Sequence, residues 1–123
     1  MIPGVPGESQ VYLNGEFLRV DEAKVSVLDR GFIFGDGIYE VVPIYARKPF
    51  RAKQHLQRLF RGLAAIGIDN PHTEAEWLDL VSQVVQAAPM SDQLIYIQVT
   101  RGVARRSHAF PNTEMTATVF IMG

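Results

Sequence analysis

The 123-residue sequence contains no cysteine, and this absence excludes several kinds of site at once. Without thiols the chain cannot form disulfides, bind a metal through thiolates or use a cysteine nucleophile. No stretch approaches the ~18 consecutive apolar residues of a membrane span, and the start of the chain lacks the basic and apolar regions of a secretory leader. A cytoplasmic location is therefore the default expectation.

An excess of charge of either sign is also missing. The chain has 12 Lys and Arg residues against 13 Asp and Glu residues, which gives a net charge of −1. A protein that binds nucleic acid through the phosphates needs a basic excess, so we expect neither a nucleic-acid partner nor a membrane partner. The chain is long enough for one domain that buries about two-thirds of its unfolded surface.

Strand patterns dominate the first part of the chain. Asn14-Gly15 between two short apolar runs is a strong hairpin signal, since both central residues of a type I′ turn take positive φ. We expect strands at residues 11–13 and 16–20, and further strands at 25–28 and 38–46. A turn is expected at Arg47-Lys48-Pro49, and residues 1–10 are predicted to form a flexible tail.

Two helices are predicted to follow. Apolar residues recur at spacings of three and four from Leu56 to Ile66, which places them on one helix face, and Gly67 marks the end of that helix. The second helix begins with a capping box, in which the Thr73 hydroxyl and the Glu76 carboxylate each accept a hydrogen bond from a backbone amide that lacks a partner.

Strands return at residues 93–100 and 116–122. Strands, then two helices, then strands predict an α+β fold: a small two-layer sandwich with a mostly antiparallel sheet and two helices on one side. The last apolar strand ends directly at Gly123, so we expect the chain to be the first half of a longer polypeptide.

The segment from Asp29 to Glu40 is the most distinctive part of the sequence. It reads Asp29-Arg30-Gly31-Phe32-Ile33-Phe34-Gly35-Asp36-Gly37-Ile38-Tyr39-Glu40, with three glycines in seven residues before a predicted strand. Glycine is tolerated where the backbone needs positive φ or a close approach. We therefore predict a bend that places Tyr39 at a defined position.

Four motifs occur in one order along the chain: Val11-Tyr12-Leu13-Asn14-Gly15, the glycine-rich segment, His55-Leu56-x-Arg58-Leu59 and Val99-Thr100-Arg101-Gly102. In this order the chain resembles the class IV, fold type IV pyridoxal-phosphate aminotransferases, and among them most closely the D-amino-acid aminotransferases. The match extends over residues 11–111. The resemblance implies that residues 11–123 form the N-terminal small domain of such an enzyme, without its C-terminal catalytic domain.

Arg58 is the residue through which the resemblance implies a cofactor contact. A single helix arginine would by itself be read as a solvated surface residue. In the family, the arginine of this His-x-x-Arg-Leu pattern binds the phosphate of pyridoxal phosphate, and a guanidinium suits that role because it stays charged and offers forked donors. His55 is expected to be a structural hydrogen-bonding residue.

The resemblance also implies a substrate-carboxylate trap formed by Tyr39, Arg106 and His108. Taken alone, Tyr39 would be core packing and Arg106 and His108 part of a solvated basic loop. The family also includes branched-chain aminotransferases and aminodeoxychorismate lyases. The Arg-x-His pair favours the D-amino-acid aminotransferases over both. Val41 and Tyr96 would line the substrate pocket. An α-carboxylate must be held by charge-assisted bonds while the α-proton is aligned for removal.

Lysine occurs only at Lys24, Lys48 and Lys53, and none of these stands in a family motif. Pyridoxal-phosphate catalysis requires a Schiff-base lysine, which the resemblance implies lies beyond Gly123. We therefore expect no catalytic residue in this chain and no activity of the chain alone. One arginine–phosphate pair contributes ~1.5–3 kcal/mol, whereas millimolar affinity needs roughly 4 kcal/mol, so we expect no pyridoxal phosphate bound to it alone.

The expected parent enzyme transfers an amino group between a D-amino acid and a 2-oxo acid, with pyridoxal phosphate as cofactor and without a metal site. Kinship with the family also suggests a homodimer. Two kinds of alternative stay open. The parent could be an aminodeoxychorismate lyase or a branched-chain aminotransferase, or the chain could be a stand-alone, non-catalytic binding module.

Overall fold

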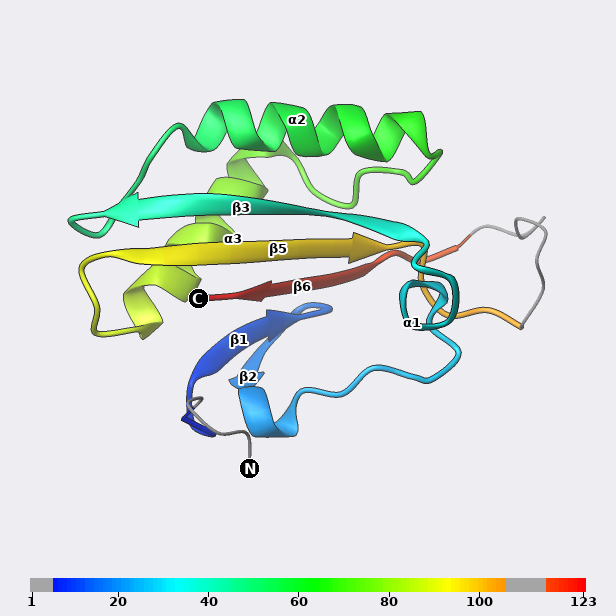
Figure 1. Cartoon of the computed structure of the whole chain (residues 1–123), viewed down its shortest axis with the longest axis horizontal. Helices are drawn as coiled ribbons and strands as arrows, with labels where there is room; N and C mark the ends of the chain where they lie inside the picture. Colours follow the sequence, from blue (N-terminus) through cyan, green and yellow to red (C-terminus); the bar gives the residue numbers. More distant parts are fainter. Residues whose placement is uncertain (1–5, 106–114) are drawn as a thin grey trace.

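The computed structural model describes residues 6–105 and 115–123, in which one six-stranded sheet is packed against helices. The strand order is β2-β1-β6-β5-β3-β4, and each neighbouring pair is antiparallel (Figure 1). The strands are β1 (Gln10–Leu13), β2 (Glu16–Arg19), β3 (Gly37–Tyr45), β4 (Lys48–Pro49), β5 (Gln93–Thr100) and β6 (Thr118–Met122). The helices are α1 (Arg30–Phe34), α2 (Ala52–Ala65), α3 (Glu74–Ala87) and the 3-10 helix η1 (Val20–Glu22).

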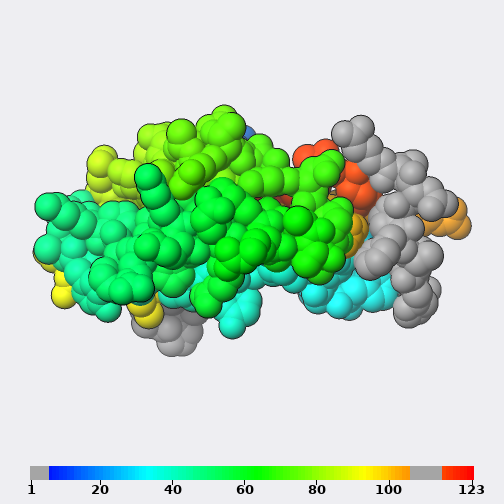
Figure 2. Space-filling view, turned by 90° about the horizontal axis from the view of Figure 1, so that it is seen from above, coloured from blue at the N-terminus to red at the C-terminus, as the bar shows by residue number. Residues whose placement is uncertain are grey.

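The two long helices pack on the same face of the sheet. Figure 1 shows α3 crossing behind the strands while α2 runs along β3, and Figure 2 shows α2 and α3 side by side from above. Among described residues, each helix is too short or too polar to cross a bilayer. The predicted α+β sandwich, with an antiparallel sheet and two helices on one side, is confirmed.

Alternation along the strands gives the sheet one covered face and one open face. On β3, Val42 and Ile44 are buried among the helices, whereas the Tyr39 side of the strand is open and Tyr39 itself is 65% exposed. The covered face meets one apolar stripe from each helix. These core residues include Ile95, Ile97, Val99 and Ile121 from the sheet, Leu56, Leu59 and Leu63 from α2, and Trp77, Val81 and Val84 from α3.

Local signals in the sequence place several boundaries correctly. Asn14 and Gly15 have φ angles of 49° and 95°, as the hairpin prediction requires. The capping box of α3 is present, with the Glu76 amide donating to Thr73 Oγ1 over 3.2 Å and the Thr73 amide donating to Glu76 Oε1 over 2.7 Å. Gly67, with a φ of 71°, follows the end of α2.

The predicted strand at residues 25–28 is wrong. Val25 and Val27 are 52% and 70% exposed, and this segment has no neighbouring strand. The chain instead enters α1, a five-residue helix. The glycine-rich sequence predicted a bend there and gave no indication of a helix. Asp29 caps this helix at its start, and Gly35, with a φ of 64°, ends it in the left-handed conformation that glycine permits.

Smaller differences concern the ends of elements. The predicted turn at 47–49 is centred on Ala46 and Arg47, both with positive φ, so Lys48–Pro49 pairs with β3 as β4. β6 begins at residue 118 rather than 116. Within the predicted tail, Gln10 already belongs to β1, and the Gly7 carbonyl accepts a hydrogen bond from the Asp21 amide.

Candidate active site

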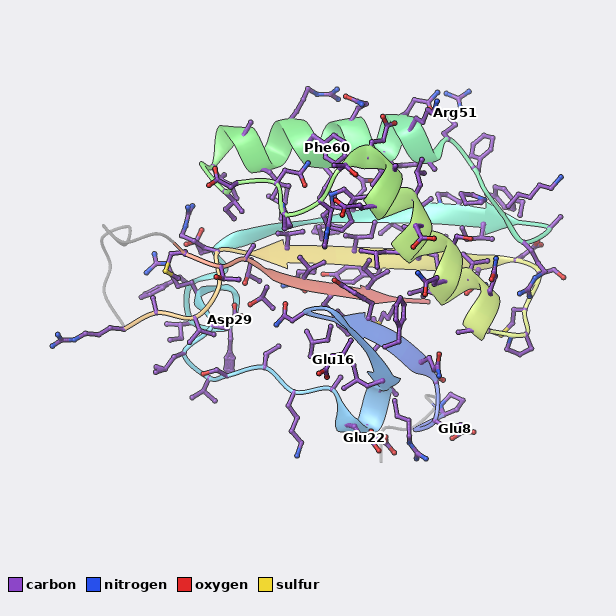
Figure 3. The ribbon with its side chains drawn as sticks, turned by 180° about the vertical axis from the view of Figure 1, so that it is seen from behind. Glu8, Glu16, Glu22, Asp29, Arg51 and Phe60 are labelled. Atoms are coloured by element: carbon purple, nitrogen blue, oxygen red, sulfur yellow. The ribbon has the colours of Figure 1, made fainter. Side chains whose placement is uncertain are left out.

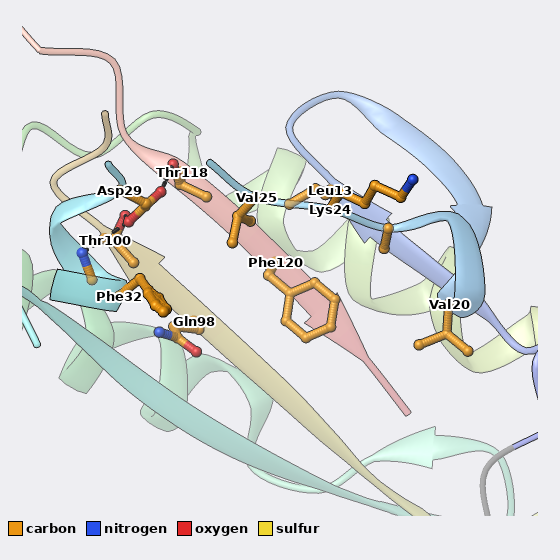
Figure 4. A pocket seen from close by; sticks show the side chains of 12 residues that line it. Leu13, Val20, Lys24, Val25, Asp29, Phe32, Gln98, Thr100, Thr118 and Phe120 are labelled. Atoms are coloured by element: carbon orange, nitrogen blue, oxygen red, sulfur yellow. Dashed lines mark hydrogen bonds between the residues drawn. The ribbon is translucent and has the colours of Figure 1, made fainter. Parts of the chain in front are cut away.

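Asp29 joins the glycine-rich segment to two strands that come much later in the chain. Its side chain is buried, and Oδ1 accepts hydrogen bonds from the Gly31 amide (2.8 Å) and from Thr100 Oγ1 (2.7 Å). Oδ2 accepts from Thr118 Oγ1 over 2.6 Å, as Figure 4 shows. These bonds hold the start of α1 against the ends of β5 and β6.

Asp36 makes a second buried junction between the same motifs. Its Oδ2 accepts from Arg30 Nε over 2.8 Å and from Arg101 Nε over 2.7 Å. Arg101 Nη2 donates in addition to the Ile66 carbonyl at the end of α2, over 2.6 Å. Burial alone would raise the pKa of Asp36, but the hydrogen bonds and charges of the two arginines outweigh it and hold that pKa below its usual value.

The predicted residues of the substrate pocket lie together on the open face of the sheet. Tyr39 on β3 stacks on Tyr96 of β5, with ring centroids 5.7 Å apart and an interplanar angle of 20°. Val41 is paired in register with Tyr96, and the Tyr96 hydroxyl donates to Gln98 Oε1 over 3.0 Å. Burial raises the pKa of Tyr96, and the neighbouring Tyr39 phenol acts in the same direction.

Arg58 lies on α2 and pairs with Glu40, the residue next to Tyr39. Arg58 Nε donates to Glu40 Oε2 over 2.7 Å, and Arg58 Nη2 donates to Oε1 over 2.6 Å. Oε1 also accepts from His55 Nδ1 over 2.9 Å and from the Val41 amide over 3.2 Å. Burial alone would raise the pKa of Glu40, but these donors and the Arg58 charge outweigh it, so the pKa is lowered.

Glu40 was not predicted as a partner of Arg58. Strand alternation could have found it, because Glu40 must face the helices if Tyr39 faces away from them. His55 and Arg58, three residues apart, lie on one side of α2. A carboxylate that points inward from a strand needs such partners, since an unpaired buried charge is costly.

Four of the six predicted site residues lie in the part of the chain that the structure describes. Tyr39, Val41 and Tyr96 share the open face, while Arg58 lies at the edge of the sheet on the helix side. Arg106 and His108 lie outside the described residues. Within residues 6–105 and 115–123, the structure shows no cluster of three or more His, Asp or Glu side chains able to hold a metal ion.

A cavity of about 390 Å³ lies beside the Tyr39–Tyr96 pair on the open face. Phe32, Val25 and Phe120 contribute apolar side chains to its lining (Figure 4). Gln98, which accepts a hydrogen bond from the Tyr96 hydroxyl, also lines it. Lys24 also contributes to the lining. Tyr39, Val41, Tyr96 and Arg58 do not line this cavity, so it adjoins the predicted substrate residues without containing them.

Several known proteins similar to this chain are D-alanine aminotransferases. The D-alanine aminotransferase of Staphylococcus aureus is 42% identical over 110 residues, which cover 89% of this chain and 39% of that protein. The D-alanine aminotransferase of Staphylococcus haemolyticus is 41% identical over 111 residues, with 90% and 39% covered. The chain thus spans about two-fifths of the length of these relatives.

Solved structures agree on the fold. The branched-chain aminotransferase of Thermoproteus uzoniensis with norvaline superposes with a TM-score of 0.76 at 28% identity, covering 94% of this chain and 40% of that one. The Escherichia coli branched-chain aminotransferase superposes with a TM-score of 0.85 at 21% identity, covering 94% and 39%. The family model described as amino-transferase class IV matches residues 37–122. This match extends from β3 through β6, and the chain accordingly belongs to the class IV aminotransferase family.

Proposed function

We propose that this chain provides the substrate-carboxylate and cofactor-phosphate contacts of a pyridoxal-phosphate-dependent transaminase that acts on a D-amino acid and a 2-oxo acid. The observation that carries the proposal is the placement of Arg58 and Tyr39 around one strand residue. Arg58 is bound to Glu40 and Tyr39 directly precedes Glu40, so a cationic group and a phenol flank the edge of β3. The similarity to D-alanine aminotransferases supports the D-amino-acid assignment.

The chemistry of Arg58 fits a phosphate group. Its side chain is 66% exposed although its partner Glu40 is buried. Glu40 takes Nε and Nη2, and among the described residues Nη1 makes no hydrogen bond. A guanidinium has five N–H donors, so several of them remain for an anion that approaches from solvent.

In the proposed reaction each residue has one task. Pyridoxal phosphate supplies, when bound, an electron sink for the negative charge that develops at Cα. Arg58 holds the phosphate, while Tyr39, Arg106 and His108 hold the α-carboxylate and so fix the direction of the Cα–H bond. Val41 and Tyr96 border the substrate side chain on the open face.

We place the reactive lysine beyond Gly123, on a second domain that completes the site. We further propose that the whole protein is a cytoplasmic homodimer. Lys24, Lys48 and Lys53 are exposed. A lysine nucleophile needs desolvation or a neighbouring cation to be activated. Their exposure favours a Schiff-base lysine outside residues 1–123.

A substrate panel tests this function in the protein that contains this chain. We expect transfer of the amino group from D-alanine to 2-oxoglutarate, with little transfer from L-leucine and no pyruvate release from aminodeoxychorismate. Formation of D- or L-glutamate and of pyruvate would be followed by chromatography. Preferential turnover of L-leucine would assign the branched-chain activity instead, and pyruvate release from aminodeoxychorismate would assign the lyase.

A further inference from the structure

The Glu40 carboxylate is the centre of a hydrogen-bonded group at the edge of the sheet. Glu40 is only 3% exposed, although it belongs to β3, which beyond its short pairing with β4 is an outer strand. Its two oxygens accept four hydrogen bonds, from the Val41 amide, His55 Nδ1, Arg58 Nε and Arg58 Nη2. The carboxylate thereby ties β3 to the first two turns of α2.

This arrangement fixes a guanidinium that would otherwise be mobile. An exposed arginine normally samples many rotamers, and ordering it costs conformational entropy. Two parallel bonds from Nε and Nη2 to one carboxylate set both the position and the plane of the guanidinium. His55 and the Val41 amide hold the carboxylate in turn, so its orientation does not depend on Arg58 alone.

We infer that Glu40 is a positioning residue, which holds the Arg58 guanidinium in advance so that its outward donors meet the phosphate of the cofactor. The inference rests on the proposed function, since it needs Arg58 to contact that phosphate. A ligand that meets an ordered side chain does not bear the cost of ordering it, and this raises affinity. Glu40 itself touches no phosphate in this role and acts through Arg58.

Electrostatics alone predicts the opposite effect of Glu40 on phosphate affinity. The direction in which the affinity changes when Glu40 is replaced therefore tests the inference. Glu40 carries a negative charge beside the guanidinium, and a negative charge near a phosphate site weakens anion binding. Removing this charge in Glu40→Gln should therefore tighten phosphate binding if charge were all that mattered. If positioning dominates, the same substitution weakens binding.

The experiment compares the dissociation constants of pyridoxal phosphate and of pyridoxal for the apo form of the protein that contains this chain. For Glu40→Gln we expect the dissociation constant of pyridoxal phosphate to rise about two- to tenfold, which corresponds to the loss of one pre-ordered side chain. The constant of pyridoxal should stay unchanged, because pyridoxal lacks the phosphate. In an Arg58→Ala background, Glu40→Gln should have no further effect on pyridoxal phosphate binding.

Glu16→Gln is the matched control, since it makes the same charge change on β2, at the opposite edge of the sheet (Figure 3). It should leave both constants unchanged. If Glu40→Gln fails to fold, Glu40→Asp keeps the charge, shortens the reach to Arg58 and is expected to weaken pyridoxal phosphate binding in the same way.

Two results would overturn the positioning role: an unchanged or lower constant for pyridoxal phosphate, or an equal rise for both ligands. Arg58→Ala separates this failure from failure of the proposed function. If Arg58→Ala weakens pyridoxal phosphate binding while Glu40→Gln does not, only the role of Glu40 is wrong. If neither substitution matters, Arg58 does not bind the phosphate.

Discussion

Replacing Asp36 by asparagine should lower the free energy of unfolding by about 3–5 kcal/mol, the usual cost of breaking a buried ion pair from one side. The Asp36 side chain is 10% exposed and accepts from Arg30 and Arg101, whose side chains are 4% and 10% exposed. The substitution leaves two buried guanidinium groups without the carboxylate charge. Urea denaturation followed by the fluorescence of Trp77, the one tryptophan of the chain, measures the change.

Asp79→Asn is the control for this prediction, because Asp79 is exposed and bonds only to Gln83 on its own helix among the described contacts. It should change the free energy of unfolding by less than about 0.5 kcal/mol. A similar small change for Asp36→Asn would show that the buried junction contributes little.

The contribution of Asp36 should also depend on pH. Its pKa is lower in the folded protein than in the unfolded chain, so the ionised form is favoured by folding. The resulting stability is fully present above the ordinary carboxyl pKa of about 4 and is lost as pH falls through the lowered pKa. The difference between the original protein and Asp36→Asn should therefore narrow in acid.

Arg106→Ala should raise the KM for D-alanine by about tenfold to one hundredfold in the protein that contains this chain. A hydrogen bond to a charged group contributes about 1.5–3 kcal/mol, and the substrate carboxylate would lose this contact. The absorption spectrum of the bound cofactor should stay the same, because Arg58 and not Arg106 is proposed to hold the phosphate. Steady-state kinetics and absorbance on the same preparation measure both quantities.

Arg105→Ala removes an equal charge from the neighbouring residue, which is exposed, and should leave the KM nearly unchanged. This control separates a specific carboxylate contact from a general loss of positive charge. Equal kinetics of Arg106→Ala and Arg105→Ala would remove Arg106 from the carboxylate trap.

Local and periodic signals predicted much of this fold. Helices α2 and α3 follow from apolar spacing and from the Thr73–Glu76 capping box, because these interactions lie within a few residues of one another. The hairpin at Asn14-Gly15 follows from the φ angles that its turn requires. In each case the determining contacts are local, so the sequence alone could reveal them.

Contacts between distant segments were not predictable in the same way. The segment 25–28 has the composition of a strand but finds no partner, which only the assembled sheet can show. The short helix α1 depends on Asp29, whose side chain also binds Thr100 and Thr118 about seventy and ninety residues later. The resemblance marked these motifs, but their mutual bonding appears only in three dimensions.

The same difference between local and long-range contacts applies to the candidate site. Alternation along a strand is enough to put Tyr39 and Val41 on one side of β3, whereas the pairing of Arg58 with Glu40 requires that α2 lie against that strand. Considered one at a time, neither the exposed Arg58 nor the buried Glu40 reveals that the other is its partner. Together they form an ion pair at the edge of the sheet.

We propose that this chain binds the anionic ends of cofactor and substrate, while the reactive amine lies elsewhere in the protein. Borohydride reduction of the cofactor-loaded protein, followed by peptide mass spectrometry, identifies the lysine that carries the cofactor. We expect a single modified lysine outside residues 1–123. A stoichiometric adduct on Lys24, Lys48 or Lys53 would contradict it.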